Sequence, residues 1–182
     1  ISTDYVFAGD AEKPYREFDV TGPQGVYGAS KLAGENFVKE FADKYFIIRT
    51  AWLYGDGKNF VKTMLNLGKT RDKLTVVCDQ FGSPTYTYDL AKLLVDMVQT
   101  DKYGIYHATN EGFCNWYEFA CEIFKQAGIS VEVAPVTSDQ YPAKAKRPFN
   151  SRMSKEKLTE NGFDRLPPWQ DALARYLKEI EF

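Results

Sequence analysis

Short runs of β-branched and aromatic residues alternate along the chain with longer amphipathic stretches. Apolar residues at helical spacing predict helices near 26–42, 58–68, 86–99, 115–127 and 168–180. The intervening runs have the length and composition of strands: YFIIRTAW, LTVVCD, GIYHAT and VEVAPV. Strands that alternate with helices are typical of an α/β fold with a largely parallel, doubly wound sheet.

Local signals mark several element ends. Asn115, followed three residues later by Glu118, predicts a helix cap, and Pro167 with Pro168 suits the first turn of the last helix. The segment TSDQYPAKAKRPFNS has no periodicity over 137–151. Long aperiodic segments are more often binding loops or disordered stretches than simple connections.

The chain opens with ISTDYVFAG, which reads as a strand entering a loop, with no methionine and no preceding helix or turn. The 182 residues, 44% hydrophobic and 26% charged, suit one globular domain, with or without a small appendage. A net charge of -2 predicts neither a nucleic-acid partner nor an anionic membrane surface. We find no apolar stretch long enough to span a membrane and no signal peptide, and we expect a cytoplasmic location.

Metal and histidine chemistry have little support. Cys78, Cys114 and Cys121 form no CxxC pair, and we expect packed, reduced thiols and no metal site. The only histidine, His107, lies in a run that alternates like a half-buried strand. We therefore do not expect catalysis that depends on histidine.

The familiar phosphate-binding loops are missing. YGDGKNF lacks the four-residue spacer of a P-loop and the Ser or Thr after its lysine, so we expect a turn before a helix. No G-x-G-x-x-G follows any strand, so these residues alone have no usual cradle for a dinucleotide.

The strongest chemical signal is VYGASKLAGE. Tyr27 and Lys31 are four residues apart, which places them on one helical stripe. A neighbouring ammonium favours the ionised form of a phenol, so Tyr27 is a credible general acid or base. A chance surface pair is the alternative. Next to the pair we expect an apolar face that packs on a sheet, formed by Ala29, Ala33, Phe37 and Phe41.

Hydroxyl groups precede this helix in STDYVF, at the expected carboxyl end of a parallel strand. Open α/β sheets bind their ligands at that end. We expect Ser2 or Thr3 to hydrogen-bond the same substrate oxygen that Tyr27 protonates.

With these residues the sequence resembles the extended short-chain dehydrogenase/reductases, which use a Ser/Thr and Tyr-x-x-x-Lys triad with a nicotinamide cofactor. Within them it is most similar to the dTDP-4-dehydrorhamnose reductase family. The similar stretches follow in order along the whole chain: STDYVFAG, YGASKLAGE, IIRTAWLYG, KNFVKTML, DQFGSPTYTYDLA, RPFNSRMSKEKL and LPPWQDALARYL. Y-x-x-x-K alone is moderately specific, whereas RTAWLYG, DQFGSPTYTYDLA and RPFNSRMS together are much more so.

The resemblance implies roles for the catalytic group. Tyr27 would protonate the C4 carbonyl oxygen of dTDP-4-dehydrorhamnose while NADPH or NADH reduces the carbon. Lys31 would lower the pKa of Tyr27 and, with Tyr27, contact the cofactor. Thr3 would orient the carbonyl. Thr50 and Ala51 would lie beside the cofactor.

The resemblance also implies a substrate side. Trp52 would face the sugar or nucleotide, with core packing as the alternative, and Arg147 would bind the diphosphate, with a solvated basic loop as the alternative. Weaker substrate-side candidates are Gln80, Gly82 and Asn150, which could instead shape turns. Asp4 is also expected among the substrate-binding residues.

The resemblance further implies that this chain is the C-terminal part of a reductase and does not include the glycine-rich βαβ unit of such enzymes. The alternative is that it is one piece of a cleaved or partly represented protein. Residues 1–54 and 85–110 would belong to the dinucleotide-binding domain, and residues 55–84 and 111–182 to the substrate region. The expected partners are the dTDP-sugar, the absent N-terminal half and, as a candidate, a second copy. We expect this chain alone to be inactive and prone to misfold or associate.

Two alternative functions remain. One is another nucleotide-sugar epimerase or dehydratase of the same superfamily, because the triad serves all three chemistries. The other is a reductase-like regulatory subunit that binds cofactor without turnover, which the intact Tyr27, Lys31 and Thr3 disfavour.

Overall fold

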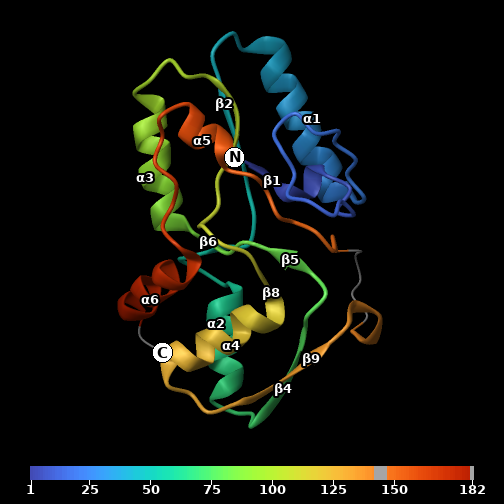
Figure 1. Ribbon diagram of the computed structural model, residues 1–182, viewed down its shortest axis with the longest axis vertical. Coiled ribbons are helices and arrows are strands. Elements are labelled where there is room, and N and C mark those ends of the chain that lie inside the picture. Colours follow the sequence, from blue (N-terminus) through green and yellow to red (C-terminus); the bar gives the residue numbers. More distant parts are fainter. Residues whose placement is uncertain (142–146, 181–182) are drawn as a thin grey trace.

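A three-stranded parallel sheet forms the centre of one half of the molecule, the upper half of Figure 1. The computed structural model describes residues 1–141 and 147–180. In the sheet, β2 (Phe46–Thr50) lies between β1 (Ser2–Thr3) and β7 (Gly104–His107). Because β2 is paired on both sides and covered by helices, its sequence is a nearly continuous apolar run rather than an alternating one.

Helices cover this sheet. A short 3-10 turn, η1 (Asp4–Val6), follows β1, and α1 (Val26–Phe41) packs against both. On the other side α3 (Thr87–Val98) and α5 (Glu156–Glu160) enclose a core with the sheet. The buried side chains of this core include Ile48, Leu90, Met97, Tyr106 and Leu158.

The second half contains a two-stranded parallel ribbon, β4 (Lys73–Val77) with β9 (Glu132–Val136). To its left in Figure 1 lie α2 (Phe60–Gly68), α4 (Trp116–Ala127) and α6 (Trp169–Glu179); α4 packs against the ribbon, and α2 and α6 pack against α4. These elements share one core, which contains Leu65, Phe119, Ile123 and Leu173.

Very short strands join the two halves. β3 (Leu53–Tyr54) pairs with β6 (Thr85–Tyr86) in parallel, and β5 (Phe81–Gly82) pairs with β8 (Cys114–Asn115) in antiparallel. A second 3-10 turn, η2 (Ser138–Gln140), follows β9. A bidentate ion pair between Arg175 of α6 and Asp89 of α3 also spans the halves.

The α/β class and all the long elements expected from the sequence are confirmed. The capping box at Asn115 and Glu118 is present in both directions. One boundary was wrong: α6 begins at Trp169, and Pro168 is its N-cap rather than part of its first turn. Four strands of two residues each and the short helix α5 were not predicted, because a pair of residues or little more than one helical turn carries too little periodicity to be detected.

Tyr106 and His107, neighbours on β7, are both completely buried, so this end of the strand is covered on both faces. The expectation of a half-buried, alternating strand was therefore wrong here. Burial, together with the nearby Arg49 guanidinium, lowers the pKa of His107 to about 3. A neutral imidazole packed edge-on against Phe7 is a core group.

The expectation that the Phe37 and Phe41 face of α1 packs on the sheet was wrong. Phe37 is 61% and Phe41 77% exposed, and Ala29 and Ala33 are also exposed. The helix instead turns Gly28, Leu32 and Glu35 inward. A periodicity argument counts every acidic residue as facing solvent. It therefore cannot foresee that Glu35 is buried next to a partner on the sheet.

The three cysteines are free, as expected, with Cys114 buried and the others partly buried. In the described ranges, no group of three His, Cys, Asp or Glu side chains is placed to hold a metal ion. None of the helices in residues 1–141 and 147–180 is long and apolar enough to cross a membrane.

Candidate active site

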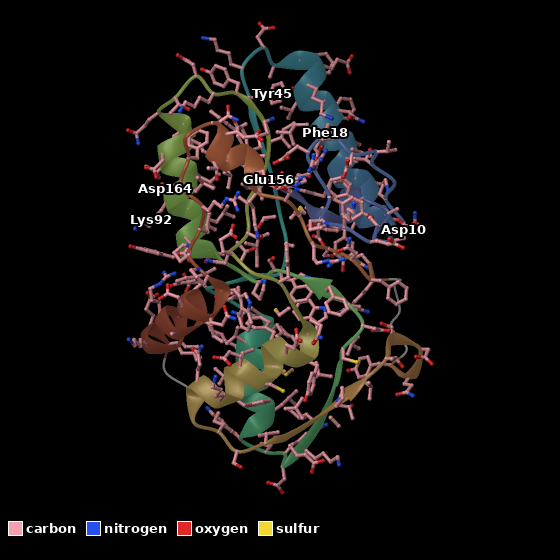
Figure 2. The ribbon with its side chains drawn as sticks, in the orientation of Figure 1. Asp10, Phe18, Tyr45, Lys92, Glu156 and Asp164 are labelled. Carbon is pink, nitrogen blue, oxygen red and sulfur yellow. The ribbon has the colours of Figure 1, made fainter. Side chains whose placement is uncertain are left out.

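The first turn of α1 borders a cavity of about 350 Å³, here called the Tyr27 cavity. Its wall is largely aromatic or small, with Tyr5, Phe7, Gly25 and Tyr27 among the lining residues. Asp10, labelled in Figure 2, lies at its rim on the loop after η1. The cavity therefore lies beyond the carboxyl end of β1, where an open α/β sheet binds its ligands.

Tyr27 faces this cavity and is 57% exposed. The ring of Tyr5 meets it edge to face, with 5.7 Å between the ring centroids. Such a contact holds a phenol ring in place while leaving its hydroxyl accessible. The arrangement suits proton exchange with a bound ligand.

Lys31 lies one turn further along α1 but lines a different, shallow depression of about 260 Å³. Ser2 and Glu35 share that depression. Among the described residues, no hydrogen bond joins the side chains of Thr3, Tyr27 and Lys31. The helix brings Tyr27 and Lys31 onto adjacent surfaces, as the spacing predicts, yet not into one cavity.

Thr3 is buried at the tip of β1, and its hydroxyl is already engaged. It accepts a hydrogen bond from the Tyr5 N–H at 3.3 Å, capping η1, and donates one to Asp4 Oδ1 at 2.9 Å. Asp4 Oδ2 has no hydrogen-bond partner, although the Ser151 side chain is close enough to favour the charged form. Burial is the larger effect and raises the pKa of Asp4 to about 6.

Thr50 and Ala51 are buried at the carboxyl end of β2, and Thr50 Oγ1 donates to Thr85 Oγ1 at 3.4 Å. Trp52 follows with φ of 49°, a strained left-handed conformation for a bulky residue. Its ring stacks on Trp116 at 3.6 Å between centroids and covers Gly82, where a Cβ atom would lie 2.7 Å from the indole. Trp52 borders neither cavity directly and supports Trp116 from behind.

A second cavity of about 320 Å³, here called the Trp116 cavity, lies between α2, β4 and the start of α4. Phe60, Met64 and Trp116 supply apolar walls, and Thr63, Thr75 and Gln80 supply polar groups. Arg147 lines both this cavity and the Tyr27 cavity. A guanidinium at this junction is suited to an anionic group that links two ligand parts.

Gln80 and Asn150 have structural bonds as well. Gln80 borders the Trp116 cavity and donates from Nε2 to Ser138 Oγ at 2.8 Å. Asn150 is buried and donates to the carbonyl oxygens of Ala11 and Lys13 at 2.7 and 2.9 Å. Residues 142–146 of the expected binding loop lie outside the described residues.

The sequence argument missed three aromatic residues of the site: Tyr5, Phe60 and Trp116. Tyr5 lies within STDYVF and would have been found by asking which side chains follow the strand tip. Phe60 and Trp116 each begin a helix directly after an Asn cap, at Asn59 and Asn115. A helix start after a cap was the available signal for both.

The sequence profile described as "RmlD substrate binding domain" matches residues 1–182. The chain is 45% identical over 180 residues to the spore coat polysaccharide biosynthesis protein SpsK of Bacillus subtilis (strain 168), covering 98% of this chain and 63% of that protein.

Solved structures give the same picture. A dTDP-4-dehydrorhamnose reductase from Clostridium acetobutylicum superposes with a TM-score of 0.96 at 50% identity. One from Bacillus anthracis, in complex with NADP, has a TM-score of 0.95 at 49% identity. Each match covers 98% of this chain and 64% of the other, so the chain spans less than two thirds of these relatives.

Proposed function

Because the chain belongs to the RmlD substrate binding domain family, we propose that it carries the substrate-binding part and the proton donor of an NAD(P)H-dependent dTDP-4-dehydrorhamnose reductase. The observation that supports this proposal is the position of Arg147, which lines both the Tyr27 cavity and the Trp116 cavity. A nucleotide sugar has the matching order of parts: base, diphosphate and sugar.

In this proposal the thymine base stacks in the Trp116 cavity against Trp116 or Phe60, and Gln80 and Thr63 provide polar contacts at its edge. Arg147 forms paired hydrogen bonds to the diphosphate. The sugar then lies in the Tyr27 cavity. Trp52 acts through Trp116, on which its ring stacks, and Gly82 leaves room for the Trp52 indole.

Tyr27 donates its phenolic proton to the C4 carbonyl oxygen as the carbonyl carbon is reduced, and the resulting phenolate regains a proton from water. A reduced nicotinamide, when bound, supplies the hydride to that carbon. The Tyr27 cavity has room beside the first turn of α1, since Gly25 lines it and a Cβ atom added at Gly25 would meet no described atom within 4 Å. Lys31, one helical turn from Tyr27, is the candidate to hold the cofactor ribose.

Thr3 and Asp4 have a supporting part in this proposal. The Thr3 hydroxyl has one proton, which it donates to Asp4 Oδ1; when the sugar binds, Thr3 exchanges this bond for one to the carbonyl oxygen and so orients the carbonyl. Thr50, Ala51 and Asn150 shape the surrounding backbone. Residues 1–54 and 85–110 form the cofactor side and 55–84 with 111–182 the substrate side, although the latter range also contributes α5 to the first core.

The three free thiols suit a reducing compartment, and we propose a cytoplasmic location. We also propose that the full-length protein forms a homodimer.

The test is turnover by the full-length gene product. Purified protein is incubated with dTDP-4-dehydrorhamnose and either NADPH or NADH, and both cofactor oxidation at 340 nm and the product are followed. We expect stoichiometric formation of dTDP-L-rhamnose. Oxidation of neither cofactor would refute the reductase, whereas conversion of the sugar without net oxidation would favour an epimerase or dehydratase.

A cofactor-binding subunit without turnover is the second candidate. The specific observation in its favour is that Lys31 and Tyr27 border different depressions and that the Thr3 hydroxyl is engaged by Tyr5 and Asp4. Cofactor binding by the full-length product, measured calorimetrically, together with no turnover and recovery of a stoichiometric partner would favour it.

A further inference from the structure

A buried polar cluster ties α1 to the sheet beside the depression that Lys31 lines. It consists of Ser2, Glu35 and Arg49, which are 5%, 3% and 2% exposed. Glu35 Oε1 accepts hydrogen bonds from Ser2 Oγ at 2.6 Å and from Arg49 Nε at 2.8 Å, and Oε2 accepts one from Arg49 Nη2 at 2.7 Å. These hydrogen bonds of Glu35 all lead to the sheet, and an ion pair of 3.9 Å with Lys39 stays on α1. Here the cluster is called the Glu35 anchor.

The register of the sheet explains how the anchor assembles. Ser2 of β1 is paired with Arg49 of β2, and partners in register point to the same face. The next pair is Thr3 with Thr50, whose side chains point to the opposite face. The carboxylate of Glu35 is thus bonded directly to the residue before Thr3.

The spacing on α1 links the anchor to the proposed proton donor. Gly28, Leu32 and Glu35 follow at intervals of four and three residues, so they share the inward stripe. Tyr27 and Lys31 each precede a member of that stripe by one position. Any rotation or slide of the inward stripe therefore moves Tyr27 and Lys31 relative to the tip of β1.

The bonding geometry favours one position of the helix. Burial alone would raise the pKa of Glu35, yet the hydrogen bonds from Arg49 and Ser2 hold it below its ordinary value, so the charged pair persists at neutral pH. A guanidinium and a carboxylate that share two bonds fit in a single register, whereas apolar side chains can slide. Arg49 is itself held by the Glu17 carbonyl at 3.2 Å and by the ring of Phe7 at 5.0 Å.

We propose that Glu35 is a positioning residue for the reduction: bonded to Ser2 and Arg49, it sets where α1 presents Tyr27 and Lys31 relative to Thr3. This inference rests on the proposed function. Glu35 lines neither cavity that would hold substrate, and its carboxylate bonds to Ser2 and Arg49 in the depression that it shares with Lys31, so we assign it a positioning role through α1.

The test compares two variants of the full-length gene product. Glu35→Gln removes the charge of the anchor and keeps its shape. The matched control is Asp89→Asn, since the Asp89 carboxylate also has a bidentate bond to an arginine, at 2.8 and 2.7 Å to Arg175, but between α3 and α6. Asp89 is 6% exposed, comparable with Glu35. For each protein kcat, KM for the sugar, the melting temperature and hydrogen exchange of α1 are measured.

We expect Glu35→Gln to lower kcat by at least about tenfold with KM within about twofold, because positioning acts on the reacting atoms and not on the nucleotide. Exchange of the α1 amides should speed up by a similar factor. Asp89→Asn should lose comparable melting temperature, with kcat and α1 exchange within about twofold of wild type. Equal losses of kcat in both variants, or an unchanged kcat in Glu35→Gln, would overturn the proposal.

Two provisions keep the test decisive. If Glu35→Gln does not fold, Ser2→Ala is used instead, because it removes one bond of the anchor and leaves the Glu35 and Arg49 charges paired. The kcat of Ser2→Ala should still fall, while its melting temperature stays near that of wild type. If wild type itself turns nothing over, the proposed function fails. The α1 exchange rates then decide whether the anchor positions the helix.

Discussion

Tyr27 differs from most tyrosines of this chain in its surroundings. Tyr54, Tyr106 and Tyr176 are 2%, 0% and 3% exposed and belong to the two large cores. Burial raises the pKa of Tyr54 and of Tyr106, which makes each a poorer proton donor at neutral pH. Tyr27 instead is 57% exposed, lines the Tyr27 cavity and has Lys31 one helical turn away, and this combination makes it the candidate acid.

Replacing Tyr27 with Phe should lower kcat by about 10²- to 10⁴-fold, because the ring remains and only the proton donor is lost. Steady-state reduction by the full-length product measures this. Tyr88→Phe is the matched control, since Tyr88 is also a helical tyrosine and is 55% exposed. A Tyr27→Phe enzyme with more than about a tenth of wild-type kcat would argue against the assigned role.

Asp4 is the buried carboxyl group beside Thr3. Because its folded pKa of about 6 lies above the ordinary value of 3.8, the folded protein binds the Asp4 proton more tightly than the unfolded chain does. The stability from this group is thus fully present below about pH 4. It is lost as the pH rises to about 6 and stays lost above that.

Asp4→Asn should therefore stabilise the protein at pH 8 and leave its stability at pH 4 nearly unchanged. The interval between 3.8 and about 6 corresponds to roughly 3 kcal/mol, or about 5 °C or more in melting temperature. Thermal unfolding followed by circular dichroism at both pH values measures the difference. Asp164→Asn, at an exposed carboxyl group labelled in Figure 2, should change neither value. Equal effects of Asp4→Asn at both pH values would refute this reading.

At the scale of elements, α1 is the helix on which the proposed chemistry depends, and its contact with η1 is unusually close. A Cβ atom at Gly28 would lie 2.1 Å from the carbonyl oxygen of Tyr5. Only glycine allows the first turn of α1 to approach η1 so closely. The glycine of YGASK therefore has a packing reason that the spacing of Tyr27 and Lys31 did not reveal.

Gly28→Ala should destabilise the protein by about 3 kcal/mol or more, because backbone must move to relieve the contact. Gly34→Ala is an internal control on the same helix, where a Cβ atom meets nothing within 4 Å. That variant should gain up to about 1 kcal/mol from better helix propensity. Urea unfolding of both proteins measures the two effects. A Gly28→Ala protein as stable as wild type would show that α1 does not need this approach.

At the scale of the whole molecule, the outer face of α1 is an exposed apolar surface. The rings of Phe37 and Phe41 stack at 6.3 Å between centroids, and Val26 is 88% exposed. Soluble proteins rarely leave clustered aromatic side chains on a helix uncovered. The 182-residue chain should therefore self-associate through this face when it is prepared by itself.

Light scattering of the 182-residue chain over a range of micromolar concentrations checks this, with an increase in mean mass expected. Phe37→Glu with Phe41→Lys should suppress the increase, because both side chains point to solvent and the new charges oppose contact. Val95→Glu with Val98→Lys is the control, on the exposed side of α3, where the valines are 58% and 69% exposed. A wild-type chain that stays monomeric would contradict the expectation.

The sequence alone determined the elements whose signals are local. Repeated apolar spacing defined α2, α3, α4 and α6, β-branched runs defined β2, β4, β7 and β9, and an Asn with a Glu three residues later defined the start of α4. Tyr27 and Lys31 could be placed on one helical stripe for the same reason. These features depend on residues within one or two turns of each other.

Only the tertiary structure decided which of these residues meet. The bond from Ser2 to Glu35 spans 33 positions, and Arg147 joins cavities whose walls come from residues 5 to 149. Pairing over such distances depends on strand register and chain crossing, which leave no periodic trace in the sequence. For the same reason the inward face of α1 followed from the buried charge of Arg49 on a neighbouring strand, and not from the apolar pattern of the helix itself.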